Sequence, residues 1–257
     1  MKKFLSVLLL LSLFVSSAYA RPTTEENDYI FTNEEGDGFA ILTPEDIMNS
    51  YLRYDPGFKE KKILYMPTDW VQNDYYDIHM GTCDYEYDEN GEDKYSIGKR
   101  GCGLTAFAIV RDYYLGSTQG YKDPTVINEE FMIPYDLCGM NWSEAASFYG
   151  LKVRDFRKMS QIVSNGSDAA IKLSKDEMST IYNVAKTYIE DEQPVIIWVN
   201  DDDGIYANHF LLIVGYATTS DGDMLLYVQN TASKSYGGLS NVLKKWEYVV
   251  QFDIIYQ

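Results

Sequence analysis

The stretch from Gly101 to Tyr114 constrains the fold more than any other part of this sequence. Between Leu104 and Val110 the only polar residue is Thr105, so a helix here is apolar on nearly all sides and is predicted to lie in the core. Cys102 lies between two glycines at the start of that helix. Free backbone N–H groups and the helix dipole at this position favour the thiolate, which is expected to lower the pKa of Cys102. The stretch predicts either a nucleophilic thiol or an ordinary buried cysteine.

The first twenty residues have the three parts of a secretory signal peptide: two lysines, an apolar run from Phe4 to Val15, and small residues ending at Ala20. We expect cleavage near Arg21 and a secreted or periplasmic protein. The apolar run is too short to span a membrane, and no cysteine follows the predicted cleavage site, so no membrane anchor is expected.

The chain of 257 residues is predicted to comprise a signal peptide (1–20), an acidic N-terminal arm or pro-segment (21–60) and one folded domain (61–257). Its formal net charge of −17 argues against nucleic acid as a partner, because phosphate binding needs clustered Lys and Arg. Three cysteines leave at least one thiol without an intramolecular partner. The simplest allocation leaves Cys102 free and pairs Cys83 with Cys138, although all three could equally stay reduced.

The periodicity predicts an α+β fold, with helices first and antiparallel strands second. One predicted helix starts at Cys102 and ends before a loop marked by Gly116 and Gly120. Two further predicted helices span Met140–Tyr149 and Ser174–Glu192. The predicted strands are Ile63–Met66, Leu151–Arg154, Pro194–Val199, Phe210–Tyr216, Met224–Val228 and one or two within Val242–Tyr256. Residues 84–95 form an acidic loop, for which a solvated loop is preferred to a calcium site.

Two polar residues lie at the ends of neighbouring strands of a predicted hairpin. His209 opens one strand and Asn230 closes the next, with residues 218–223 as the connection. Pairing around that connection places His209 opposite Ala232 and therefore on the same face as Asn230. A connection with an odd number of residues would reverse the faces unless a β-bulge corrects the register.

These residues supply the groups of a thiol-based acyl transfer. Cys102 is the candidate nucleophile, His209 the base that takes and returns its proton, and Asn230 the group that orients the imidazole. The backbone N–H of Cys102 and the carboxamide of Gln72 are candidate donors to the oxyanion. Taken singly, each has an ordinary structural interpretation, and His79 is interpreted as a surface histidine.

Two signatures in these residues resemble the papain-like cysteine peptidases, and within them the bacterial double-glycine-leader (bacteriocin-processing) peptidases. The first is Gly101-Cys-Gly-Leu-Thr105 with Tyr113-Tyr-Leu-Gly116, and the second is Pro194-Val195 followed by Asn208-His-Phe210 and Val214-Gly-Tyr216. The resemblance implies a papain-like fold whose N-terminal helical part carries the nucleophile on a central helix and whose C-terminal antiparallel sheet carries the base.

The resemblance also implies the roles assigned above to Cys102, His209, Asn230 and Gln72, with no cofactor and no metal. The chain departs from that branch at Leu104, which replaces a proline, and at Asn230, which stands where aspartate is usual. We therefore expect an exported cysteine peptidase that hydrolyses peptide bonds of a protein or peptide substrate through an acyl-enzyme. The alternatives are an inactive papain-like interaction module and a transglutaminase-type acyl transferase.

Overall fold

The computed structural model describes residues 59–156, 171–172, 174–200, 208–220, 222, 224–232, 235–238 and 248–257. The predicted signal peptide (1–20) and the predicted arm (21–60), except its last two residues, lie outside this described part.

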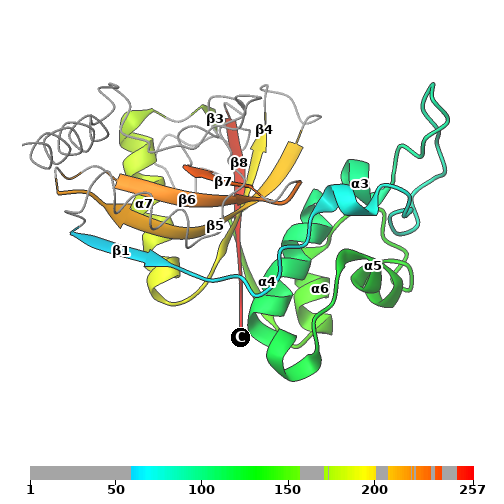
Figure 1. Cartoon of the computed structure of the whole chain (residues 1–257), viewed down its shortest axis with the longest axis horizontal. Coiled ribbons are helices and arrows are strands. Elements are labelled where there is room, and N and C mark those ends of the chain that lie inside the picture. The colour runs from blue at the N-terminus through cyan, green and yellow to red at the C-terminus, as the bar shows by residue number, and fades with distance from the viewer. Residues whose placement is uncertain are drawn as a thin grey trace, which may run out of the picture.

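The described chain forms a helical part beside an antiparallel sheet (Figure 1). The helical part contains η1 (Gln72–Tyr75), α3 (Ile97–Arg100), α4 (Cys102–Gln119), α5 (Pro124–Ile127), the π-helix η2 (Asn128–Met132) and α6 (Trp142–Phe148). The strands are β1 (Glu60–Ile63), β2 (Lys152–Phe156), β3 (Ile171–Lys172), β4 (Val195–Asn200), β5 (Asn208–Thr218), β6 (Met224–Asn230), β7 (Ser235–Gly238) and β8 (Tyr248–Tyr256). Their order is β2-β8-β4-β5-β6-β7, with β1 on β5 and β3 on β8. The predicted α+β arrangement is confirmed.

The helix predicted around Leu104–Val110 is confirmed as α4, and every residue of that run is buried. α4 continues through Gly116, where we expected a loop, and ends at Gly120, whose φ of 79° lies in the left-handed region. Gly116 is a buried helical residue, and a methyl group at this position would strike the ring of Tyr121, so the position requires glycine for packing. The glycine that ends the helix is the one with the special backbone conformation.

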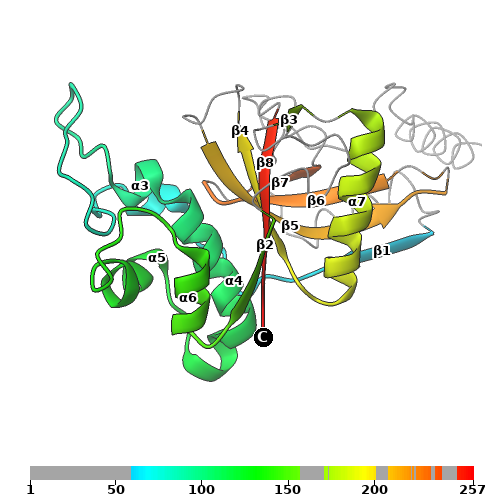
Figure 2. The same cartoon turned by 180° about the vertical axis from the view of Figure 1, so that it is seen from behind.

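The sheet separates two cores, because successive side chains of a strand point to opposite faces. On one face Leu212 and Val214 pack with the apolar residues of α4. On the other face Leu211 and Ile213 pack with α7 (Lys175–Glu190), which lies across the sheet in Figure 2. The β5 strand is thus buried on both sides.

The hairpin of β5 and β6 contains the bulge that the face argument required. Thr218 pairs with Met224, so the connection is residues 219–223, an odd number and one fewer than predicted. The register shifts between Ile213 and Gly215, which leaves Val214 as an extra residue in β5. Beyond this shift Leu211 pairs with Asn230, and His209, two residues earlier, shares the face of Asn230.

Other elements agree with the sequence to different degrees. α7 starts with the predicted capping box of Ser174 and Glu177, and α6 is capped by the Asn141 side chain. The first strand was predicted three residues too late, since β1 ends at Ile63, although the Leu64 N–H still donates to the Val214 carbonyl at 2.7 Å. β7 was not predicted.

Replacing Gly215 by alanine is expected to destabilise the protein. A Cβ at this position would lie 2.7 Å from the Lys62 carbonyl oxygen and 3.0 Å from the Tyr227 ring, so β1 would have to move off β5. Such overpacking costs about 1–3 kcal/mol of unfolding free energy, which urea denaturation measures. Gly139→Ala is the matched control, because nothing lies within 4 Å of its added Cβ. Equal stability of the two variants would contradict the packing at the bulge.

Candidate active site

His209 and Asn230 meet at the end of the β5–β6 hairpin. The His209 Nε2 atom lies 2.7 Å from Asn230 Oδ1, and both residues are buried. Asn230 Oδ1 also accepts the Ala232 N–H at 3.0 Å, which identifies this atom as the carbonyl oxygen of the amide. Nε2 must therefore carry the proton in this contact. In a neutral imidazole, Nδ1 is then the basic nitrogen.

Cys102 lies against the residue that follows His209. The backbone N–H groups of Phe210, Gly103 and Cys102 itself are close enough to the sulfur to favour its thiolate form. A Cβ on Gly103 would lie 3.3 Å from the Phe210 ring, so the first turn of α4 packs directly on β5. The thiol thus reaches the strand that carries the histidine.

Gln72 joins the same region from the start of η1. It is buried, its backbone N–H donates to the Thr231 carbonyl at 2.8 Å, and its Nε2 donates to the Gly98 carbonyl at 3.0 Å. Thr231 follows Asn230 and its hydroxyl donates to the Phe210 carbonyl at 2.6 Å. Gly98 belongs to α3, which leads into Cys102.

The structure brings His209 and Asn230 into direct contact, and it connects Cys102 and Gln72 with the segments of this pair only through neighbouring residues. The contacts run through their neighbours in the chain, Phe210, Thr231 and Gly98. Their catalytic roles remain predictions.

The expected pKa of Cys102 is wrong in direction. Burial raises the pKa of the thiol, and this effect outweighs the N–H groups of Phe210, Gly103 and Cys102 and the positive charge of Arg100, which all favour the thiolate. The side chain retains 9% of its accessible surface. A helix start stabilises a thiolate, but removing the ion from water costs more here.

A buried ionic cluster holds the segment before Gln72, and the sequence analysis missed it. Asp112 of α4 accepts the Trp70 indole N–H at 2.9 Å and the backbone N–H of Lys122 at 3.0 Å. Arg111 donates to Asp112 at 2.7 Å, and both side chains are fully buried. An Arg-Asp pair directly after an apolar helical run was the available signal, because such charges are rarely buried unless paired.

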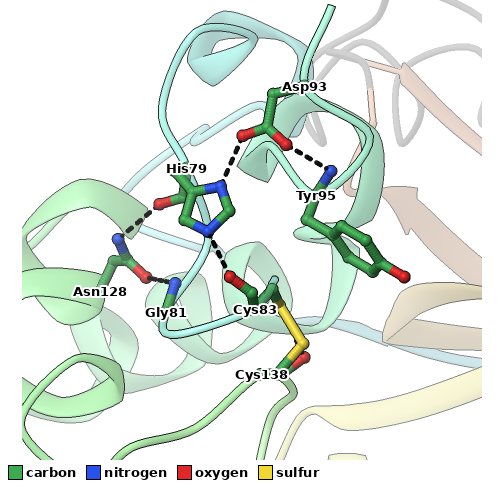
Figure 3. The surroundings of a disulfide bond; sticks show 7 residues. All are labelled: His79, Gly81, Cys83, Asp93, Tyr95, Asn128 and Cys138. Carbon is green, nitrogen blue, oxygen red and sulfur yellow. Dashed lines mark hydrogen bonds and ion pairs between the residues drawn. A yellow bond between two sulfur atoms is a disulfide. The ribbon is translucent and has the colours of Figure 1, made fainter. Parts of the chain in front are cut away.

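His79 is not a surface histidine, contrary to our expectation. Its Nδ1 lies 2.6 Å from Asp93 Oδ2 and its Nε2 lies 2.9 Å from the Cys83 carbonyl oxygen, as Figure 3 shows. Its ring also stacks on Tyr85, with 3.8 Å between centroids. Both ring nitrogens are engaged, so His79 serves structure rather than proton transfer.

The disulfide between Cys83 and Cys138 is present, which leaves Cys102 as the free thiol (Figure 3). It ties the base of the acidic loop to the segment that precedes α6. The Thr82 N–H reinforces this tie by donating to the Leu137 carbonyl at 3.0 Å.

The acidic loop is organised by hydrogen bonds. Asp88 Oδ1 accepts the backbone N–H groups of Asn90 and Glu92, and its Oδ2 pairs with Lys99 at 2.6 Å. Across the described ranges, no group of three or more His, Cys, Asp or Glu side chains is placed to hold a metal ion. Nor does any helix in those ranges have the length and apolar character needed to cross a membrane.

Comparison with known proteins does not assign this chain to a family. No family model matches the chain, and no curated protein matches it. Among solved structures, a protein from Bacillus anthracis described as C39-like peptidase is similar to this chain, with a TM-score of 0.39 and 15% identity over 77% of this chain and 98% of that one. At that score and identity the likeness assigns neither a family nor an activity.

The buried thiol makes a prediction about its reactivity. Because burial raises the pKa of Cys102, its alkylation by iodoacetamide should be slow near neutral pH and should keep accelerating beyond about pH 8.5, the ordinary thiol value. Mass spectrometry of the intact protein under non-reducing conditions follows this one site, since Cys83 and Cys138 are paired. A rate that is already maximal in mildly acidic solution would instead show a preformed thiolate.

Proposed function

We propose that this protein is an exported cysteine peptidase that cleaves peptide bonds through an acyl-enzyme on Cys102. The observation that carries the proposal is the hydrogen bond of 2.7 Å between His209 Nε2 and Asn230 Oδ1, formed next to the residue whose N–H reaches the Cys102 sulfur. This bond fixes the proton on Nε2 and leaves Nδ1 as the base. Export rests on the pattern of the first twenty residues.

In the first step His209 acts as a general base. Because the thiol pKa is raised, the resting thiol is protonated, and Nδ1 takes its proton as the sulfur attacks the scissile carbonyl carbon. The new S–C bond converts the carbonyl into a tetrahedral oxyanion, and the imidazole becomes imidazolium. Asn230 stabilises that cation through its carbonyl oxygen.

Two N–H groups are available to the oxyanion. The backbone N–H of Cys102 belongs to the first residue of α4 and lacks an intrahelical acceptor. The Gln72 carboxamide uses one N–H for the Gly98 carbonyl and has a second to donate. Preformed donors of this kind need no reorganisation during the reaction.

In the second step the tetrahedral intermediate collapses, and the C–N bond breaks. The His209 imidazolium gives its proton to the leaving amine, so Nδ1 is again a base. It then takes a proton from water as the water oxygen attacks the thioester carbon. When this second tetrahedral intermediate collapses, the S–C bond breaks, the acid leaves, and the His209 imidazolium returns its proton to the Cys102 sulfur. Protons and charges balance over the cycle, and no cofactor is needed.

The central test compares the two histidines. With an internally quenched peptide library as substrate, Cys102→Ala should abolish cleavage and His209→Ala should lower kcat about 10²–10⁴-fold, the usual contribution of a general acid–base. His79→Gln is the matched control, expected to lower stability and retain turnover, because His79 holds Asp93 and the Cys83 carbonyl instead of the thiol.

The products formed in this assay distinguish the alternative functions. Transfer of the acyl group to a labelled primary amine in preference to water would replace hydrolysis by a transglutaminase-type reaction. Absence of both products with folded wild-type protein would leave the inactive interaction module.

Gln72 gives a second, independent prediction. Gln72→Ala removes one donor to the oxyanion, which costs about 10²–10³-fold in kcat in comparable sites and should leave KM nearly unchanged. Steady-state kinetics and thermal unfolding measured together distinguish this result from misfolding. A higher KM at constant kcat would mean that Gln72 binds substrate without stabilising the oxyanion.

A further inference from the structure

Arg100 stands two residues before the candidate nucleophile. α3 ends at Arg100, Gly101 follows, and α4 starts with Cys102, so the Cα atoms of Arg100 and Cys102 are separated by at most about 7.6 Å. The Arg100 side chain is exposed. An exposed cationic residue therefore lies two positions along the chain from the sulfur that would meet a scissile carbonyl.

Within the described part of the chain this cation pairs with no acidic side chain, although the full sequence carries 39 Asp and Glu against 22 Lys and Arg. The neighbouring Lys99 pairs with Asp88 at 2.6 Å and with Glu92 at 2.9 Å. Among the described residues, no carboxylate forms an ion pair with Arg100. Its guanidinium lies 5.8 Å from the centroid of the Tyr95 ring, so the side chain is held by a cation–π contact instead.

The orientation of Tyr95 is itself fixed. Its backbone N–H donates to Asp93 at 2.9 Å, and Asp93 is held by His79 (Figure 3). The Tyr95 carbonyl accepts the Met80 N–H at 2.9 Å. The guanidinium thus rests on a ring whose backbone belongs to the network around the disulfide.

The charge of Arg100 also acts at the thiol, where it opposes the effect of burial on the pKa of Cys102. The guanidinium is therefore close enough to exert a field where the reaction would occur. An anionic group of a bound substrate would experience the same field.

We propose that Arg100 binds a carboxylate of the substrate within two residues of the scissile bond, so that acidic peptides are preferred. The inference rests on the proposed peptidase function. A guanidinium presents paired N–H donors that match a carboxylate, and such charge-assisted hydrogen bonds are about twice as strong as neutral ones. An extended peptide advances about 3.3–3.6 Å per residue, which keeps neighbouring side chains within reach of Arg100.

The carboxylate can come from two sources, an Asp or Glu side chain or the C-terminus of the substrate. A cleaved peptide from the quenched library provides the starting sequence, into which Glu, Gln or Lys is placed at each of the two positions on either side of the cleaved bond. Each peptide is made with a free and with an amidated C-terminus. Preference for Glu over Gln identifies the side chain, and preference for the free terminus identifies the C-terminal carboxylate.

For one pair of peptides that differ only in a carboxylate, wild-type protein should show a higher kcat/KM for the member that carries it. Arg100→Gln should reduce the ratio of these two kcat/KM values about tenfold. Arg100→Glu should reverse the preference toward Lys. Arg154→Gln is the matched control, because Arg154 is also exposed and lies 5.9 Å from the Tyr188 ring, on the sheet strand β2. This control should keep the wild-type ratio.

Alkylation supplies a readout that does not depend on turnover. Iodoacetate and iodoacetamide both form an S–C bond at Cys102 with loss of iodide, and differ in the negative charge of the first. Arg100→Gln should lower the iodoacetate-to-iodoacetamide rate ratio, and Arg154→Gln should not. If Arg100→Gln retains peptidase activity and neither the cleavage ratio nor the alkylation ratio changes, the proposed role of Arg100 is overturned and the peptidase proposal stands. Absence of cleavage by wild-type protein would overturn the peptidase proposal, and this inference with it.

Discussion

The register of one β-hairpin determines whether His209 and Asn230 can meet at all. Side chains alternate between the two faces of a strand, so one added residue moves a side chain to the other face. Counted from the turn, Asn230 would lie opposite Leu212 and point away from His209. The extra residue Val214 shifts the register and places Asn230 opposite Leu211 instead. The hydrogen bond of His209 with Asn230, and with it the tautomer of the imidazole, depends on this bulge.

The pKa of the Cys102 thiol is determined by two opposing effects of its position at the start of α4. The start of α4 supplies N–H groups that favour a thiolate, but packing α4 against β5 removes the sulfur from water and raises its pKa. The mechanism we propose, proton transfer to His209 during attack, is compatible with this balance and requires no resting ion pair. Among the described residues, the exposed Arg100 contributes a positive charge that opposes the effect of burial on this pKa.

A buried ion pair and a disulfide keep the distant segments in place. Asp112 holds Trp70, two residues before Gln72, on α4, while Arg111 neutralises it in the core. The disulfide and His79 hold the base of the acidic loop, which leads through Tyr95 to α3 and Cys102. Each uses a charge or a covalent bond where apolar packing alone would not fix orientation. The segments that carry the candidate site are therefore joined by polar or covalent contacts, while the cores beneath them are apolar.

The sequence by itself determined the elements with strong local signals: the apolar helix α4, the capped helix α7, the order of helices before strands, and the chemical identity of Cys102, His209, Asn230 and Gln72. These follow from periodicity and capping, which depend on residues close in the chain. Tertiary structure alone decided the bulge at Val214, the pairing of His79 and the direction of the Cys102 pKa. Each depends on pairing and burial in the folded protein, which are set by packing rather than by local preference.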